Sequence, residues 1–104
     1  MKIEKKFEEK DLTVSVEGRI DTITSQELEN SLNDEIENIT SLTLDFTNLE
    51  YISSAGLRVL IATQKKLNEK NIPMTITNVN DIIKEIFRMS GFDKILEIKW
   101  IILN

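Results

Sequence analysis

Two adjacent hydroxyl side chains, Ser53 and Ser54, lie in the stretch Tyr51–Leu57, between an apolar run and an amphipathic run. A serine at the start of a helix can cap it, because its oxygen accepts a hydrogen bond from one of the first backbone N–H groups. A serine can also be phosphorylated, and a phosphate there would lie at the positive end of the helix dipole. The pattern therefore leaves two roles open for this pair, a helix cap and a site of modification.

The composition limits what other chemistry these serines can take part in. The chain has no cysteine and no histidine, which removes disulfides, thiolate nucleophiles, Cys-type zinc sites and the usual base at neutral pH. A hydrolase with Ser54 as nucleophile would need a neighbouring base, and the glycine two residues before the serine of a nucleophile elbow is missing. We therefore expect no catalytic residue, no metal site and no cofactor, and no glycine-rich phosphate loop is present.

Length and charge indicate one small domain that binds proteins or small molecules. The 104 residues, 40% apolar and 30% charged, fit a single globular domain over 1–104, and we expect a monomer. The net charge of -5 disfavours binding to nucleic acid or to anionic membranes. No apolar stretch is long enough to span a membrane and no secretory leader is recognisable, so we expect a cytoplasmic protein.

The first half of the chain predicts a hairpin followed by a helix. Alternating apolar and polar residues favour strands at 2–7 and 12–17 with a turn at 9–11, and Gly18 then lets the chain bend. Thr24–Glu27 has the form of a capping box, in which Thr24 and Glu27 would satisfy each other's neighbouring N–H groups. The apolar stripe of the helix that follows consists of Leu28, Leu32 and Ile36.

The second half alternates strands and helices. Its predicted elements are a strand at 42–47 that Tyr51 and Ile52 continue, a helix at 55–70, a strand at 74–77, a helix capped by Asn80 or Asp81 and ended by Gly91, and an extended segment at 95–98. The apolar face of the third helix would comprise Ile82, Ile83, Ile86, Phe87 and Met89. Trp100–Leu103 would form a last strand or an exposed contact. This order predicts an α/β fold, with a mixed sheet of about five strands and about three helices packed on it.

Three segments together resemble the STAS family, and within it the small stand-alone anti-sigma factor antagonists of bacteria. They are Gly18–Asp21, Leu44–Leu60 and Ile86–Phe92. Each segment alone is weak, but their order and spacing are fairly specific and the match spans nearly the whole chain. The resemblance implies the STAS fold.

The same resemblance implies a phosphorylation switch. The unmodified protein would bind an anti-sigma factor that is also a serine kinase and so free a sigma factor; phosphorylation would end the binding, and a serine phosphatase would reset it. The family's acceptor is the first serine of an Asp-Ser-Ser-Gly pattern, which falls on Ser54 when the glycine is laid on Gly56. Ser53 then replaces the family's aspartate, which removes a negative charge and makes Ser53 the runner-up acceptor.

The partner-binding surface implied by the resemblance comprises Asp21, Ser53, Ser54, Gly56 and Arg58. Asp21 matches a family position beside the acceptor, but it could equally order a turn after Gly18. Arg58 follows Ser54 by four residues and could lie one turn below it on the same helical face. It would contact a phosphate or the partner, or it would be an ordinary exposed arginine.

A second function remains open within the same family. The chain could be a STAS interaction subunit of a transporter or of a stress-sensing assembly, which binds by shape and is not phosphorylated. In that case Ser53 and Ser54 would only cap a helix.

Overall fold

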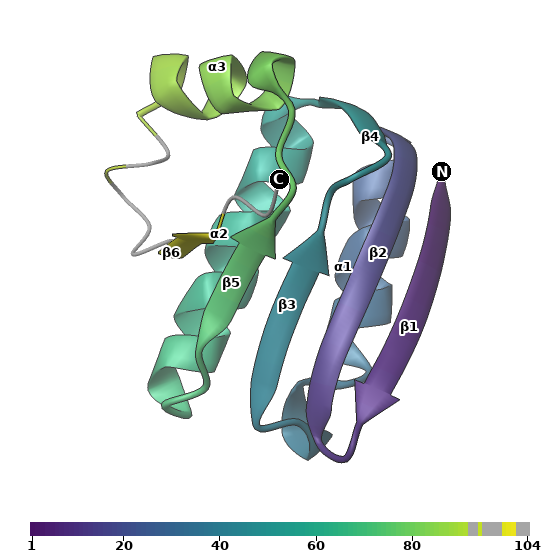
Figure 1. The fold of residues 1–104 in the computed structure, drawn as a ribbon, viewed down its shortest axis with the longest axis vertical. Helices are drawn as coiled ribbons and strands as arrows, with labels where there is room; N and C mark the ends of the chain where they lie inside the picture. The colour runs from purple at the N-terminus through teal and green to yellow at the C-terminus, as the bar shows by residue number, and fades with distance from the viewer. Residues whose placement is uncertain (92–93, 95–98, 102–104) are drawn as a thin grey trace.

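The computed structural model describes residues 1–91, 94 and 99–101 (Figure 1). The elements in chain order are β1 (Lys2–Glu8), β2 (Asp11–Ile20), α1 (Thr24–Asn33), a 3-10 helix (Ile36–Asn38), β3 (Ser41–Asp45), β4 (Leu49–Ile52), α2 (Ser54–Glu69), β5 (Met74–Thr77), α3 (Asp81–Met89) and β6 (Lys99–Ile101). The expected α/β fold with a mixed sheet and three helices is confirmed for this part of the chain.

The sheet is built around β2, its long second strand. The strand order is β1-β2-β3-β5-β6, in which β1 is antiparallel to β2 and the other neighbours are parallel. The first half of β2 pairs with β3, and its last residues, from Gly18 to Ile20, pair with β4 across a register shift. The strand predicted at 42–47 is thus divided in two, because the chain turns at Phe46–Asn48 before it rejoins β2.

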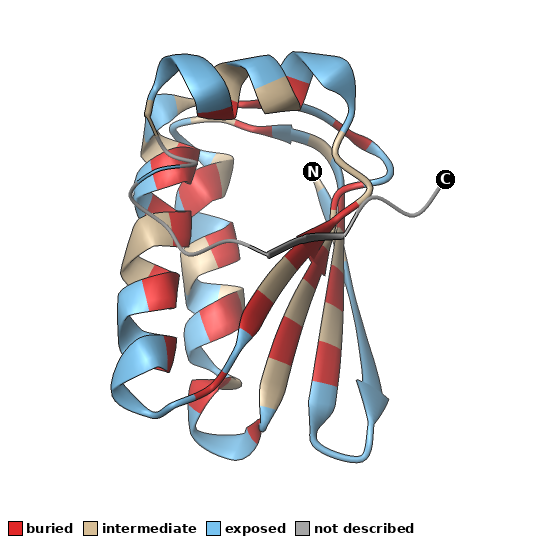
Figure 2. Ribbon diagram, turned by 60° about the vertical axis from the view of Figure 1, so that its left-hand side comes forward, coloured by how far each residue is buried: buried red, intermediate tan, exposed pale blue. Residues whose placement is uncertain are grey.

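Two helices, α1 and α2, cover one face of the sheet, and α3 lies across the end of the molecule at which β2 and β4 finish (Figures 1 and 2). The predicted inward residues of β2 are buried, as are those of the predicted first helix stripe: Leu12, Val14, Val16, Leu28, Leu32 and Ile36. Ile36 lies in the 3-10 helix and not in α1, because α1 already ends at Asn33. Burying each such side chain stabilises the fold by about 1.5 to 3 kcal/mol. Within the described residues, no helix combines the length and the apolar character needed to cross a bilayer.

The opposite face of the sheet carries hydroxyl and charged side chains. Thr13, Thr43 and Thr75 lie in register across β2, β3 and β5, one row away from Ser15 and Asp45. Most of these side chains are half-buried rather than buried. This polar face explains why the strands alternate instead of being apolar throughout.

The third helix has a narrower apolar face than its sequence predicts. Ile83 and Phe87 are buried and Ile86 is partly buried, whereas Ile82 and Met89 are 63% and 75% exposed. Its predicted ends are confirmed. The Asn80 Oδ1 accepts a hydrogen bond from the Ile83 N–H at 2.8 Å, and Gly91 has a φ of 73°.

The predictions for the C-terminal segment are tested only in part. The extended segment at 95–98 lies outside the described residues, as do residues 102–104. Lys99–Ile101 forms β6 in parallel register with β5, so the start of Trp100–Leu103 is a strand.

Candidate functional site

The two serines occupy different positions at the start of α2. Ser53 is the N-cap, in an extended conformation, and its Oγ accepts a hydrogen bond from the Gly56 N–H at 3.2 Å. Ser54 is the first residue of the helix and is exposed. Its hydroxyl makes no hydrogen bond within the described residues. The cap and the accessible hydroxyl are therefore separate side chains, which the sequence pattern alone did not distinguish.

Pairing between β2 and β4 sets the surroundings of these serines. Ile20 lies in register with Ile52, and the Ser53 N–H donates a hydrogen bond to the Ile20 carbonyl oxygen at 2.8 Å. Asp21 follows Ile20 directly, as Ser53 follows Ile52. Asp21 and the start of α2 therefore leave the same end of the sheet side by side, as the resemblance implies for the partner-binding surface.

Asp21 organises the start of α1. Its Oδ1 accepts hydrogen bonds from the backbone N–H of Thr24 at 2.8 Å and of Ile23 at 2.9 Å, and from the Thr24 hydroxyl at 3.0 Å. The bonds from Thr24, followed by that from Ile23, hold the pKa of the Asp21 carboxyl below its usual range. The carboxylate is thus ionised at neutral pH on a half-buried side chain.

The predicted capping box at Thr24–Glu27 does not form. The N-cap of α1 is Ile23, with no side-chain cap bond, and the Thr24 Oγ contacts Asp21 and the Arg19 carbonyl instead. Asp21, three residues before Thr24, supplies an ionised acceptor that a serine or threonine hydroxyl cannot match. The turn-ordering role considered for Asp21 is confirmed, and contact with a partner stays a prediction.

Gly56 is buried, so its role at this site is packing. A Cβ atom added there would lie 2.6 Å from the Ile20 Cγ2 and 2.7 Å from the Ile52 Cγ1. Only glycine lets the first turn of α2 lie this close to β2 and β4. Gly56 therefore fixes where the serines stand, and a direct contact between its own atoms and a partner is not favoured by this burial.

Two arginines border the serines. Arg58 is exposed on α2, four residues after Ser54, and makes no ion pair within the described residues. The Arg19 guanidinium carbon lies 4.5 Å from the centre of the Tyr51 ring, a cation–π contact between β2 and β4. Arg19 was not among the predicted site residues, because its place beside Tyr51 depends on strand pairing that the sequence does not reveal.

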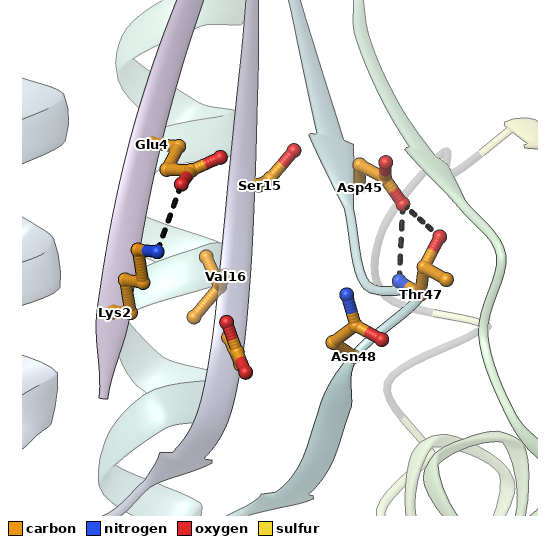
Figure 3. Close-up of a pocket in the computed structure, with 8 residues that line it drawn as sticks. Lys2, Glu4, Ser15, Val16, Asp45, Thr47 and Asn48 are labelled. Atoms are coloured by element: carbon orange, nitrogen blue, oxygen red, sulfur yellow. Dashed lines mark hydrogen bonds and ion pairs between the residues drawn. The ribbon is translucent and has the colours of Figure 1, made fainter.

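A separate polar hollow, with a volume of about 120 Å³, lies on the open face of the sheet. Figure 3 shows Lys2 and Glu4 on one side and Asp45 with Thr47 on the other. Partial burial raises the pKa of Asp45, but hydrogen bonds from Thr47 and Asn78 outweigh it and leave the pKa below its usual range. None of the predicted site residues lines this hollow. No group of acidic side chains suited to a metal ion occurs in the described part of the chain.

The architecture defines an α/β domain whose accessible serine starts a helix at the end of a mixed sheet. The family model described as the STAS domain matches residues 2–103. The chain belongs to the STAS family.

Curated relatives match most of the chain. The anti-sigma-B factor antagonist of Staphylococcus aureus is 28% identical over 99 residues, which is 94% of this chain and 92% of the relative. The anti-sigma F factor antagonist of Paenibacillus polymyxa is 29% identical over 89 residues, 84% of this chain and 76% of the relative.

Solved structures show the same fold. An anti-sigma factor antagonist from Mycobacterium paratuberculosis matches with a TM-score of 0.82 and 23% identity, over 93% of this chain and 83% of the other. The anti-sigma factor antagonist SpoIIAA in its unphosphorylated form matches with a TM-score of 0.80 and 13% identity, over 94% and 88%. At these identities the likeness concerns the fold alone.

Proposed function

We propose that this protein is an anti-sigma factor antagonist whose binding is switched off by phosphorylation of Ser54. The unphosphorylated form binds an anti-sigma factor that has serine kinase activity and so releases a sigma factor. The observation that carries the proposal is the exposed hydroxyl of Ser54 at the first position of α2, next to the ionised Asp21. Its family membership and the names of its relatives support the same role.

The chemical step is a phosphoryl transfer from ATP bound to the partner. The Ser54 Oγ attacks the γ-phosphorus, the bond to the β-phosphate oxygen breaks, and ADP leaves while a base of the kinase takes the hydroxyl proton. This chain contributes only the acceptor, so we propose no catalytic activity for it. A serine phosphatase would hydrolyse the phosphate ester and restore the hydroxyl.

The phosphate would block binding through its charge and its size. Phosphoserine carries roughly -1.5 to -2 charges near neutral pH. It would stand beside the Asp21 carboxylate on one surface, and an acidic group of the partner facing it there would cost several kcal/mol. The N-terminus of α2 would itself stabilise the phosphate charge by about 0.3 to 1 kcal/mol, the value for an exposed site. Binding would therefore fail while the fold stays intact.

The geometry favours Ser54 over Ser53 as acceptor. The Ser53 Oγ already accepts a hydrogen bond from the Gly56 N–H, and the residue is less exposed than its neighbour. A phosphoryl group on the Ser53 Oγ would weaken this oxygen as the acceptor of the cap bond, which is worth on the order of 1 kcal/mol. We also propose that the protein is a monomer in the cytoplasm. It would need no cofactor and would bind neither nucleic acid nor membrane.

Incubation with the cognate kinase and ATP, read by intact mass and peptide fragmentation, tests the assignment. We expect one phosphoryl group on Ser54 in the wild type and in Ser53→Ala, and none in Ser54→Ala. A phosphate on Ser53 would move the acceptor by one residue. Stable partner binding without any phosphate gain would instead support the passive STAS subunit of a transporter or stress-sensing assembly.

A further inference from the structure

We propose that Arg58 binds the phosphate of phosphorylated Ser54 within the same chain; this inference rests on the proposed role of Ser54 as acceptor. Ser54 and Arg58 lie four residues apart on α2, and both are exposed. Residues at this spacing are neighbours on a helix surface, with about 5 to 6 Å between their Cβ atoms. The arginine is therefore placed to reach an oxygen attached to Ser54.

The direction of helical side chains favours this contact. Each Cα–Cβ bond in a helix tilts toward the N-terminus, so the Arg58 side chain leans over the turn that begins with Ser54. An acidic group placed four residues before a basic one is also the better of the two orders for such a pair. Phosphorylation of Ser54 creates that order.

Arg58 has no competing partner within the described residues, unlike the other two arginines of the chain. Arg19 lies against the Tyr51 ring, and the Arg88 guanidinium is hydrogen-bonded and ion-paired with Glu85. The first turn of α2 also contains no acidic residue. A phosphate on Ser54 is thus the anion closest in sequence to Arg58 on its own helix face.

The charges around Ser54 favour a nearby cation once the serine is phosphorylated. Asp21 follows the end of β2 next to the serines, and its carboxylate is ionised, so it repels a phosphate dianion on Ser54. A guanidinium can bind two phosphate oxygens at once in a planar fork, which a lysine cannot do. Arg58 would offset the repulsion and hold the phosphate in one orientation.

This pairing changes what a partner meets on the surface. In the unmodified protein Arg58 is a basic group open to a partner, and in the modified protein it would be occupied by the phosphate. A single phosphorylation would therefore withdraw a positive charge from the surface as well as add negative charge. The switch would act through two side chains on one helix turn.

The test uses the full chain with phosphoserine installed at position 54 during translation, so no kinase is needed. Phosphorus NMR then gives the second pKa of the phosphate, which is about 6 for a free phosphoserine. We expect a value lower by about half a pH unit in the wild type than in Arg58→Gln, as Coulomb attraction across about 6 Å in water predicts.

A matched control removes the same charge elsewhere on the helix. Lys65 is exposed on α2 and eleven residues from Ser54, about 16 Å along the axis and beyond the screening length of about 8 Å at physiological salt. Lys65→Gln should therefore leave the phosphate pKa at the wild-type value. Arg19→Gln is a second control, because it removes a positive charge that acts on Asp21 and leaves Arg58 in place.

A second readout separates direct binding from general attraction. Hydrogen exchange at the Arg58 Nε should slow when Ser54 carries the phosphate, and Arg58→Lys should restore only part of the pKa difference. Equal phosphate pKa values in the wild type and Arg58→Gln, a pKa that responds to Arg19→Gln alone, or unchanged exchange at Arg58 would each overturn the proposal. Because the phosphate is installed directly, failure here leaves the kinase experiment standing, and failure of the kinase experiment leaves this result standing.

Discussion

The backbone N–H of Ser53 donates a hydrogen bond to the carbonyl oxygen of Ile20 at 2.8 Å. This bond joins the two segments that leave β2 and β4, so Asp21 and Ser54 stand at one end of the sheet although 33 positions separate them in the sequence. A partner that docks on one of them meets the other.

Substitutions at Ser54 should separate binding from its control. Ser54→Ala should keep the partner bound in the presence of ATP, because no phosphate can form, and Ser54→Asp should weaken binding by about tenfold or more, because it adds a negative charge to the surface that faces the partner. Dissociation constants from titration calorimetry with and without ATP measure both effects. Equal affinities for the wild type, both variants and the phosphoprotein would contradict the switch.

Ser53→Ala should destabilise the protein by about 1 kcal/mol, because the Gly56 N–H loses the acceptor that caps α2. Urea unfolding monitored by circular dichroism measures the free energy of unfolding. Ser54→Ala is the matched control and should change it by less than about 0.5 kcal/mol, as expected for a surface substitution. The same loss in both variants would show that the cap bond is not the cause.

Gly56→Ala should destabilise the fold by about 1 to 3 kcal/mol, because its Cβ would overlap the Ile20 and Ile52 side chains. Ile52→Ala removes one of those obstacles. The double variant should therefore lose less stability than the sum of the two single variants, a coupling that a double-mutant cycle in urea measures. Strict additivity would argue against steric overlap.

Asp21→Asn should remove an acid-sensitive part of the stability. Because the folded pKa of Asp21 lies below its unfolded value, its contribution is fully present above about pH 4 and is lost as the pH falls through the folded pKa. The difference in unfolding free energy between the wild type and Asp21→Asn should thus be smaller at about pH 3 than at about pH 6.

Parallel curves for the wild type and Asp21→Asn would show that the bonds to Thr24 and Ile23 do not favour the ionised form.

Ile23→Ser should weaken partner binding and leave stability nearly unchanged. The Ile23 side chain is 83% exposed, two residues after Asp21, so its removal deprives the core of nothing. A desolvated apolar anchor at an interface is worth about 1 kcal/mol or more, which corresponds to roughly fivefold in affinity. Met89→Ser, at an exposed apolar position at the far end of α3, is the comparison and should leave binding unaltered.

Much of the fold follows from local patterns. The alternation in β2 and the stripe of Leu28, Leu32 and Ile36 place the core correctly, because burial on one face enforces the period of each element. The end signals of α3 also hold. Asn80 and Gly91 act through bonds and dihedral angles that involve only their own neighbours.

The errors arise where a longer-range choice decides. The sequence allows Thr24 either a capping box with Glu27 or hydrogen bonds to Asp21. In the structure Thr24 donates to the ionised Asp21 carboxylate. The division of the third strand depends on how β2 shares its length between β3 and β4, which local propensity does not encode. The different roles of Ser53 and Ser54 likewise needed the position of the first helical residue, and neighbouring hydroxyls give no hint of it.

The absence of a side chain at position 56 reaches beyond packing. Because Gly56 lies directly against Ile20 and Ile52, the first turn of α2, which carries Ser54, has no space to move toward the sheet. A phosphate on Ser54 would therefore be attached to a fixed first turn of α2, and regulation would act through the exposed side chains of that turn. A related chain that keeps this close packing at Gly56 can change its exposed residues to suit a new partner without changing the packing of α2 on the sheet.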